Sequence, residues 1–572
     1  MKARRRRWRW MLIVVGLLAV AAVVLHWPVA APELQIGPET TVLDGPVNPD
    51  GTINYLAALN AEAAQGVTND NNAAVLLVRA FGPMAIESME AREVILGLFG
   101  LESLPGEGAY FVRLKDWAAA QPAPTQPAAP PGAFGPPGMP PLPPGSWPVP
   151  PGGGPAGPDF WSPSPPLVGK LREQLGESVK APWDPKAQPE LAKWLQENDA
   201  ALDLVAEAGG RSRYYVPRVP RDDMPGLLWT WPGGVGTEME AARGLEARAM
   251  RKLHAGDMPG AWADTRAAWR LGRLEYQRRD VFGCLASTGM EQVACQGTAA
   301  LTASGQLIAE AARGMLAEID ALPPRGDVVE AVDRGERFAM LDAMMAVMRG
   351  VPIDAIRYDS TKPLRRPDLD PNEMLRVGNH WYDQLVGVMR KPAGPERAAA
   401  DEAYKQDLLN AKRQAQGPAA GARRLLLKAG GWPCRKARSR QEGLRLVAML
   451  MPVLARAATL QEEGAAKADL TLVAVALAGH RAQTGRYPDG LGELSPGWLK
   501  EIPPDRFTGK DLVYRRTEAG YVLYSPGPDG VDDQGLQREK YAEKYDVVIR
   551  VPPAADEPQV QPDEPPHLPF EE

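Results

Sequence analysis

The chain has 572 residues, which is too long for one ordinary core and predicts several domains. Its hydrophobic content of 44% and charged content of 24% are those of a globular protein, and a net charge of -6 gives no basis for binding nucleic acid. Three cysteines (Cys284, Cys295 and Cys434) are too few for a disulfide framework, and we expect Cys284 and Cys295 to be buried thiols.

The N-terminal segment indicates the cellular compartment. An uncharged apolar run from Trp10 to Leu25 follows six cations, which are Lys2, Arg4, Arg5, Arg6, Arg7 and Arg9. Cations before an apolar helix hold that end in the cytoplasm. We therefore expect a basic cytoplasmic stub over residues 1–9 and a transmembrane helix or signal anchor over 10–31 of a single-pass inner-membrane protein, with its bulk on the periplasmic side. A cleaved signal peptide with its site at 29–31 is the alternative.

Composition divides the rest of the chain. We expect a tether and an N-terminal helical part over 32–120, with helices near residues 53–66 and 68–81. Residues 121–166 are so rich in Pro and Gly that they predict a disordered insert, and the Pro/Asp/Glu-rich residues 552–572 predict a disordered acidic tail. Between them we expect a helical body over 167–468 and a separate module over 469–551.

The helical body contains one hairpin pattern. In residues 242–279 an apolar stripe (Leu245, Ala249, Leu253) precedes the Gly256-Asp257 turn, and Ala261, Ala268 and Leu271 face back. Small residues at the crossing let two helices approach closely. The stretch resembles one tetratricopeptide-type repeat. The predicted fold class is therefore mainly α, built of helical hairpins, with a small α+β C-terminal domain and an N-terminal transmembrane helix.

Charged residues elsewhere in the body allow two interpretations each. Arg211, Arg213, Tyr214, Tyr215, Arg218 and Arg221 resemble a base-stacking surface, but we expect a solvated loop. Glu330, Asp333, Glu336 and Asp342 alternate with arginines, which predicts a charged helix face, whereas Met340, Met344 and Met348 predict core. The basic stretch 421–440 fits either an anionic lipid surface or a solvated linker.

The module over 469–551 has the most specific order of signals. Its helix, over residues 468–483, carries the apolar stripe Leu470, Val473, Ala474 and Leu477, and we expect Pro452 to interrupt the helical segment before it. Strands are predicted at 512–514 and 521–524, joined by a hairpin with Gly520 at positive φ. The loop over 525–535 then places Asp529, Asp532 and Asp533 close together, where a hard cation with oxygen ligands would neutralise them.

The same module resembles the C-terminal globular domain of type II secretion major pseudopilins. The resemblance rests on ALAGHRAQTGRYP at 476–488, DRFTGK at 505–510, LYSPGPDG at 523–530 and YDVVI at 545–549. It implies a calcium site in the acidic loop, with Asp529 as the best-matched ligand and Asp532, Asp533 and Asp546 as further candidates. The charged segment after Gln534 departs from the glycine-rich family pattern, and the family's N-terminal processing site is missing.

The sequence lacks the HExxH, Walker, GxSxG, SxxK and paired CxxC motifs of common enzyme and metal sites. We expect a non-catalytic, membrane-anchored envelope protein with a scaffold role, a Ca²⁺-stabilised C-terminal module, and envelope proteins as partners. One alternative is a metal-dependent envelope hydrolase that uses Glu373, His380 and Asp383, which lie on one predicted helix. The other is a component of a type II secretion-like system.

Overall fold

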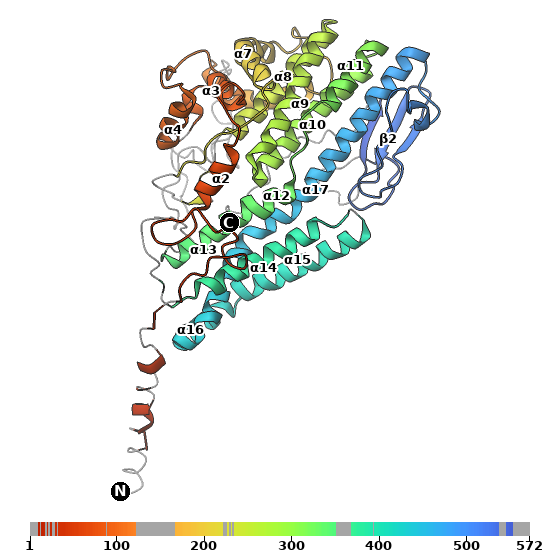
Figure 1. Ribbon diagram of the computed structural model, residues 1–572. Helices are drawn as coiled ribbons and strands as arrows, with labels where there is room; N and C mark the ends of the chain where they lie inside the picture. Colours follow the sequence, from red (N-terminus) through yellow and green to blue (C-terminus); the bar gives the residue numbers. More distant parts are fainter. Residues whose placement is uncertain are drawn as a thin grey trace, which may run out of the picture.

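The computed structural model describes residues 32–121, 166–220, 234–350, 368–536 and 545–552 apart from 87 and 393, with scattered positions at 10–30, 226–230 and 366. The predicted insert, except for its first and last residues, and the predicted acidic tail, except for Pro552, lie outside the described residues. In the described part the fold is mainly α-helical with a small sheet near the C-terminus, as predicted (Figure 1).

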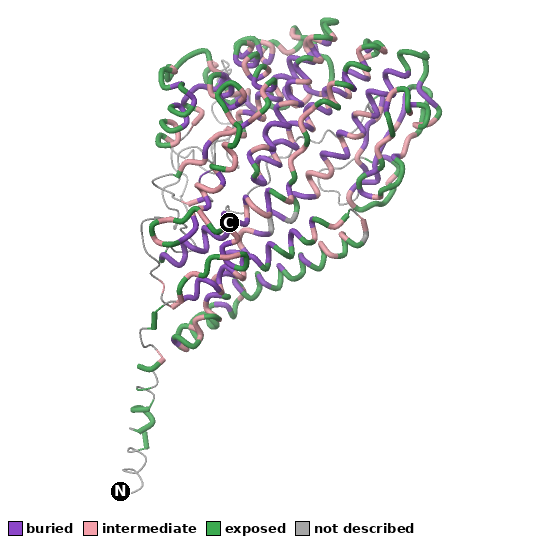
Figure 2. Tube along the Cα trace, in the orientation of Figure 1, coloured by how far each residue is buried: buried purple, intermediate pink, exposed green. Residues whose placement is uncertain are grey.

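The N-terminal segment extends away from the body. Its described residues between Trp10 and Leu25 are helical, and all but Leu25 are exposed (Figure 2). Because several positions there are not described, the predicted transmembrane helix stays a prediction. Among the described residues, one helical stretch, Trp432–Thr484, is long and apolar enough to cross a membrane. Because 53% of its apolar window is buried against the rest of the chain, it has the surroundings of a core helix.

Polar caps determine where the first helices begin. Asn54, Asn72 and Ser88 each accept a hydrogen bond from a backbone N–H in the first turn that follows. They begin α2 (Tyr55–Ala63), α3 (Ala73–Phe81) and α4 (Met89–Phe99); η1 (Pro83–Ala85) lies between α3 and α4, and α5 (Leu114–Ala120) follows. The apolar sides of α3, α4 and α5 face the first of two hydrophobic cores.

Longer helices build the rest of that core: α6 (Pro166–Ser178), α7 (Pro189–Ala208), α8 (Val235–His254), α9 (Met258–Glu275), α10 (Val281–Ala303) and α11 (Ala309–Asp320). The short η3 (Tyr276–Arg278), between α9 and α10, contributes Tyr276 to the second core. Helices α8 and α9 form the predicted hairpin, and Gly256 makes the turn at φ 81°. The predicted stripe residues Leu245, Leu253 and Ala268 are fully buried. The helical hairpin is therefore confirmed.

A second group of helices surrounds the second core: α12 (Val328–Glu330), the π-helical η4 (Ala331–Glu336), α13 (Arg337–Met348), α14 (Pro371–Met389), α15 (Pro395–Gln416), α16 (Ala420–Ala429) and η6 (Trp432–Cys434). The predicted core methionines Met340, Met344 and Met348 are buried. The predicted charged face is wrong for Asp342, which is only 8% exposed. Its carboxylate is held inside because it accepts a 2.8 Å hydrogen bond from the backbone N–H of Leu227.

Helix α17 (Arg435–Thr484) runs along both cores (Figure 1). Its first half contributes Leu446 and Met451 to the second core, and its second half contributes the predicted stripe from Leu470 to Leu477 to the first. The predicted interruption at Pro452 is wrong, because the backbone stays helical through that residue. Burial of the neighbouring turns offsets the one backbone hydrogen bond that proline removes.

The sheet packs against the C-terminal half of α17. Strands β1 (Val513–Arg516), β2 (Tyr521–Ser525) and β3 (Val547–Val551) form an antiparallel meander in the order β1-β2-β3, and η7 (Leu491–Leu494) precedes them. The predicted hairpin is present, but the positive φ predicted for Gly520 is wrong. Glycine is needed there because a β-carbon would collide with the carbonyl oxygen of Val551.

The sheet and the helical body share one core. Tyr521, Leu523 and Ile549 belong to the same buried cluster as the central residues of α7 to α11. The predicted boundary between residues 468 and 469 falls inside α17. Both ends of this 50-residue helix are thereby held by tertiary packing: the sheet covers one end, and α14 to α16 surround the other (Figure 1).

Candidate functional site

The predicted acidic loop begins at a buried support. Asp505 is 1% exposed, and its carboxylate accepts hydrogen bonds from the hydroxyl groups of Thr508 and Ser525 and a 2.7 Å bond from the Thr508 backbone. Ser525 ends β2, so this bond joins the turn before the hairpin to the start of the loop. Gly527 and Gly530 then adopt positive φ values of 74° and 68°, which bend the chain back towards β3.

Asp546 closes the loop from the other side. It is 2% exposed and accepts hydrogen bonds from the backbone N–H groups of Asp533 (3.3 Å) and Gly535 (2.6 Å). Burial raises the pKa of Asp546, the two backbone donors lower it, and the negative charges of Asp533 and Asp532 raise it further. Carboxylate charge is therefore concentrated beside the first residues of β3.

The four predicted metal ligands differ in their surroundings. Oδ1 of Asp532 accepts hydrogen bonds from the hydroxyl group of Tyr524 (2.9 Å) and the backbone of Gln534 (2.8 Å). Asp529 is exposed and accepts a 3.1 Å bond from Val531 within its own turn. Oδ2 of Asp533 is buried and has no hydrogen-bond partner among the described residues.

This environment fits a cation in part. The unsatisfied oxygen of Asp533 and the carboxylates beside it are the donor type that Ca²⁺ takes. In the described part of the chain, however, no three His, Cys, Asp or Glu side chains are arranged to hold a metal ion. Residues 537–544, which continue the loop, lie outside the described residues. The calcium site thus stays a prediction.

The alternative metal site on α14 is not assembled. Glu373 forms an ion pair with Arg440 of α17, and Asp383 forms a 2.7 Å ion pair with Arg337 of α13. His380 is exposed between them. The spacing does place the three residues on neighbouring parts of one helix face. However, each carboxylate is bound by an arginine of a different helix, and neither is directed at His380 to form a metal site.

A buried carboxyl pair in the helical body was not expected from the sequence. Glu238 opens α8 and Glu275 closes α9, and because the hairpin is antiparallel both lie at the same end. The hydroxyl group of Tyr214 donates a 3.0 Å hydrogen bond to Glu238, and Arg278 lies 3.5 Å from Glu275. Burial and the negative charge of Glu238 raise the pKa of Glu275, and its side chain hydrogen-bonds to Glu238.

The pair can hold a proton, because one carboxyl group donates to the other only when it is protonated. Glu275 is fully buried and Glu238 is 4% exposed. A substrate in solvent therefore does not reach either group in this conformation. The hairpin pattern contains the signal that could have predicted this pair, because an antiparallel hairpin places the first turn of α8 beside the last turn of α9.

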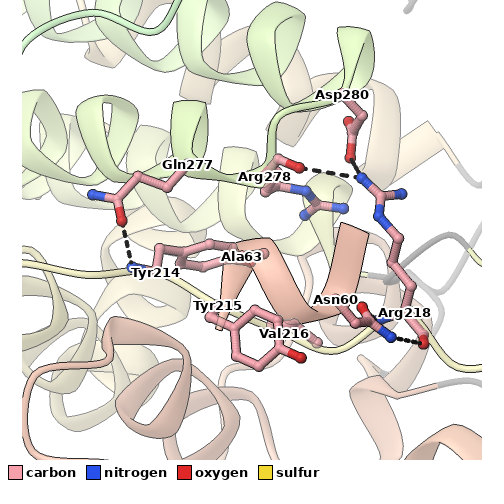
Figure 3. A pocket seen from close by; sticks show the side chains of 9 residues that line it. All are labelled: Asn60, Ala63, Tyr214, Tyr215, Val216, Arg218, Gln277, Arg278 and Asp280. Atoms are coloured by element: carbon pink, nitrogen blue, oxygen red, sulfur yellow. Dashed lines mark hydrogen bonds and ion pairs between the residues drawn. The ribbon is translucent and has the colours of Figure 1, made fainter. Parts of the chain in front are cut away.

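A small cleft lies beside this cluster (Figure 3). Its lining comes from α2, the connection between α7 and α8, η3 and the N-cap of α10. The residues are Asn60, Ala63, Tyr214, Tyr215, Val216, Arg218, Gln277, Arg278 and Asp280. A volume of about 20 Å³ has room for roughly one water molecule. Arg218 crosses the cleft to bind Asp280 at 2.8 Å and the backbone oxygen of Arg278 at 3.1 Å (Figure 3).

These contacts correct one prediction. The prediction of a solvated loop over residues 211–221 is wrong for Tyr214, which is 3% exposed, and for Arg218, whose side chain is only 15% exposed. Arg221 lies outside the described residues. Asn60 exchanges two hydrogen bonds with the backbone of Arg218, which pulls the segment onto α2. The cleft is therefore a place where helices and a connecting segment are tied together by ion pairs. No protein-family model, curated protein or solved structure matches the chain.

Proposed function

We propose that the protein is a non-catalytic scaffold of the cell envelope, moored to the inner membrane by its N-terminal helix, with its bulk on the exported side. The observation that carries the proposal is α17. A 50-residue helix is about 75 Å long, and this one lies in both hydrophobic cores. Such a helix supports a rigid body that keeps the sheet at a fixed distance from the mooring.

The contacts of the N-terminal segment support the mooring end. The indole of Trp432 donates a 3.2 Å hydrogen bond to the backbone oxygen of Val24. Arg435, the first residue of α17, donates to the backbone oxygens of Val29 (2.7 Å) and Ala30 (2.9 Å). The end of the apolar segment is thus tied to the start of the long helix, so a force on one is transmitted to the other.

An exposed apolar surface supports the partner-binding role. On η1 and α4, four large apolar side chains are at least half exposed: Met84, Met89, Val94 and Leu98. Val94 and Leu98 lie one turn apart and face away from the buried side of α4, which carries Ile95 and Phe99. Val94 and Leu98 adjoin each other on one side of α4, whereas Met89 lies on another side, so this pair is the one that we expect to contact a partner protein.

Calcium is the second part of the proposal. Asp533 and Asp546 would hold the ion between the loop and β3, with Asp532 beside them and Asp529 at the exposed side. When bound, Ca²⁺ would neutralise the carboxylates that repel one another there. The support comes from the buried, unsatisfied oxygen of Asp533 and from the raised pKa of Asp546.

Site-specific photo-crosslinking in host cells tests the scaffold role. A photoreactive residue at Leu98 is expected to crosslink the full chain to envelope proteins in the membrane fraction. The same residue at Glu93, which is exposed on another face of α4, is the matched control. Recovery of the chain in the soluble cytosolic fraction, or equal crosslinking at both positions, would contradict the proposal. A mature N-terminus created by processing would instead favour the secretion-system alternative.

A further inference from the structure

Helix α16 turns its apolar side towards solvent. Leu425 and Leu426 are 71% and 73% exposed, and with Ala422 and Ala429 they follow the i, i+3, i+4, i+7 spacing of one helix face. These two alanines are also exposed. Leu427, on the opposite side, is half-buried, and its backbone oxygen accepts a 2.8 Å hydrogen bond from Arg438 of α17. The helix is therefore held to the body by its other side.

Cations flank this apolar face. At 100° per residue, Arg423 and Lys428 lie on the two sides of the stripe, and the exposed Arg424 lies further round the helix on the side of Lys428. Among the described residues, none forms an ion pair with these three cations. From Leu408 to Gln441 the sequence contains no acidic residue. An apolar stripe between cations is the arrangement of a helix that lies in the headgroup layer of an anionic membrane.

The position of α16 identifies what covers this face. Two residues after its end, Gly431 brings its backbone against the carbonyl oxygen of Leu25, at φ 62°. Trp432, which is 47% exposed, binds the backbone of Val24. Helix α16 therefore lies beside the exported end of the apolar N-terminal segment (Figure 1). Tryptophan at such a position is typical of the membrane–water interface.

We propose that α16 is a second membrane contact: its leucines enter the outer leaflet of the inner membrane, and its cations bind anionic phospholipid headgroups. The proposal rests on the proposed mooring by the N-terminal helix, because that helix places α16 at the bilayer surface. A membrane helix and an interfacial helix that meet at Gly431 fix both the depth and the tilt of the body. The chain then has two attachments to the bilayer, which restrict rotation of the body relative to the membrane more than a single attachment would.

The test uses the full chain in liposomes with an environment-sensitive nitrobenzoxadiazole label. In a Cys434→Ser background, Leu425→Cys carries the label, since Cys284 and Cys295 are buried. Ile308→Cys, with a 63% exposed side chain on the body, is the matched control. We expect spin-labelled lipids to quench the label at position 425 several-fold more than at position 308 in liposomes that contain phosphatidylglycerol. Arg423→Glu, Arg424→Glu and Lys428→Glu together should reduce this quenching, and so should liposomes of phosphatidylcholine alone.

Two outcomes separate this inference from the mooring itself. If the chain floats with the liposomes but the labels at positions 425 and 308 are quenched equally, α16 does not touch the bilayer and the inference is wrong. A blue-shifted label at position 425 that lipid spin labels do not quench points to a protein partner or a second copy, and it also overturns the inference. Failure of the unlabelled chain to float would refute the mooring. Both substituted positions are exposed, and thermal melting checks that each variant folds.

Discussion

Arg248 and Asp264 form a buried ion pair with two hydrogen bonds between α8 and α9. The Nε–Oδ2 distance is 3.0 Å and the Nη2–Oδ1 distance is 2.8 Å, and both side chains are 5% exposed. Arg248 also binds Asp203 of α7 at 2.8 Å. One guanidinium thus joins three helices of the first core, inside the hairpin that the sequence predicted.

Arg248→Ala is expected to destabilise the protein strongly. The variant removes both guanidinium hydrogen bonds to the buried Asp264 and leaves Lys252, 2.6 Å from Oδ2, as its remaining cation. Breaking a buried ion pair costs about 3–5 kcal/mol, and because Lys252 stays we expect a loss at the lower end, about 3 kcal/mol. Chemical denaturation followed by circular dichroism measures the loss. Arg266→Ala is the matched control on the same hairpin, because its ion pair with Glu318 is about 40% exposed and is expected to contribute under about 1 kcal/mol. Similar losses of unfolding free energy in the two variants would show that burial of the Arg248–Asp264 pair does not increase its contribution to stability.

The pH dependence of stability is expected to depend on Asp342. Burial raises its pKa to about 6, against the opposing effects of the Leu227 N–H donor and Arg349. The native state therefore keeps a proton that the unfolded chain releases at lower pH. The resulting stabilisation is complete below the unfolded pKa of about 3.9 and is lost as the pH rises through about 6, by up to about 3 kcal/mol.

Thermal melting between pH 4 and pH 7 checks this dependence. This range covers the interval between the unfolded and the folded pKa of Asp342. Asp342→Asn keeps an acceptor for Leu227 but no longer titrates, so its melting temperature should fall less over this range than that of the wild-type protein. Asp320→Asn, at an exposed carboxyl group, should leave the wild-type slope unchanged. A wild-type slope that persists in Asp342→Asn would assign the effect to other groups.

Calcium is expected to raise the melting temperature of the full chain. At about 100 times Kd, a ligand that binds only the native state stabilises it by about 2.7 kcal/mol. Asp533→Asn should abolish this calcium-dependent shift, whereas Glu518→Gln, at the exposed hairpin tip, should keep it. In chelator, Asp533→Asn should melt no lower than the wild-type protein, because it removes a negative charge that acts on Asp546. A wild-type melting temperature that calcium does not change would exclude the site.

Gly431 is expected to hold the N-terminal segment in place. Any side chain there collides with the carbonyl oxygen of Leu25, and φ is 62°. Gly431→Ala should therefore speed solvent exchange of the indole N–H of Trp432 in the membrane-bound chain, because its hydrogen bond to the backbone oxygen of Val24 loosens. Gly421→Ala, with open space around the new methyl group, is the control. Unchanged exchange in Gly431→Ala would mean that the segment does not need this contact.

Local signals predicted much of the secondary structure. The stripe from Leu470 to Leu477, the methionines of α13 and the Gly256 turn were all readable, because each depends on residues within one or two helical turns. The acidic loop was also located from sequence, since its aspartates are neighbours along the chain. Whether it binds calcium depends on how Asp546 meets Asp533, thirteen residues earlier.

The sequence by itself determined the helical class, the small sheet and the basic character of residues 421–440, but it did not predict that part of this stretch forms the helix α16. Only the tertiary structure decided which charged groups are buried and which apolar face is exposed. Asp342 is buried because Leu227, 115 positions away, supplies its donor, and α17 stays continuous at Pro452 because distant helices cover the turns around it. Such contacts depend on which segments meet in space. The hydrophobic periodicity of one helix does not predict which distant segments pack against it.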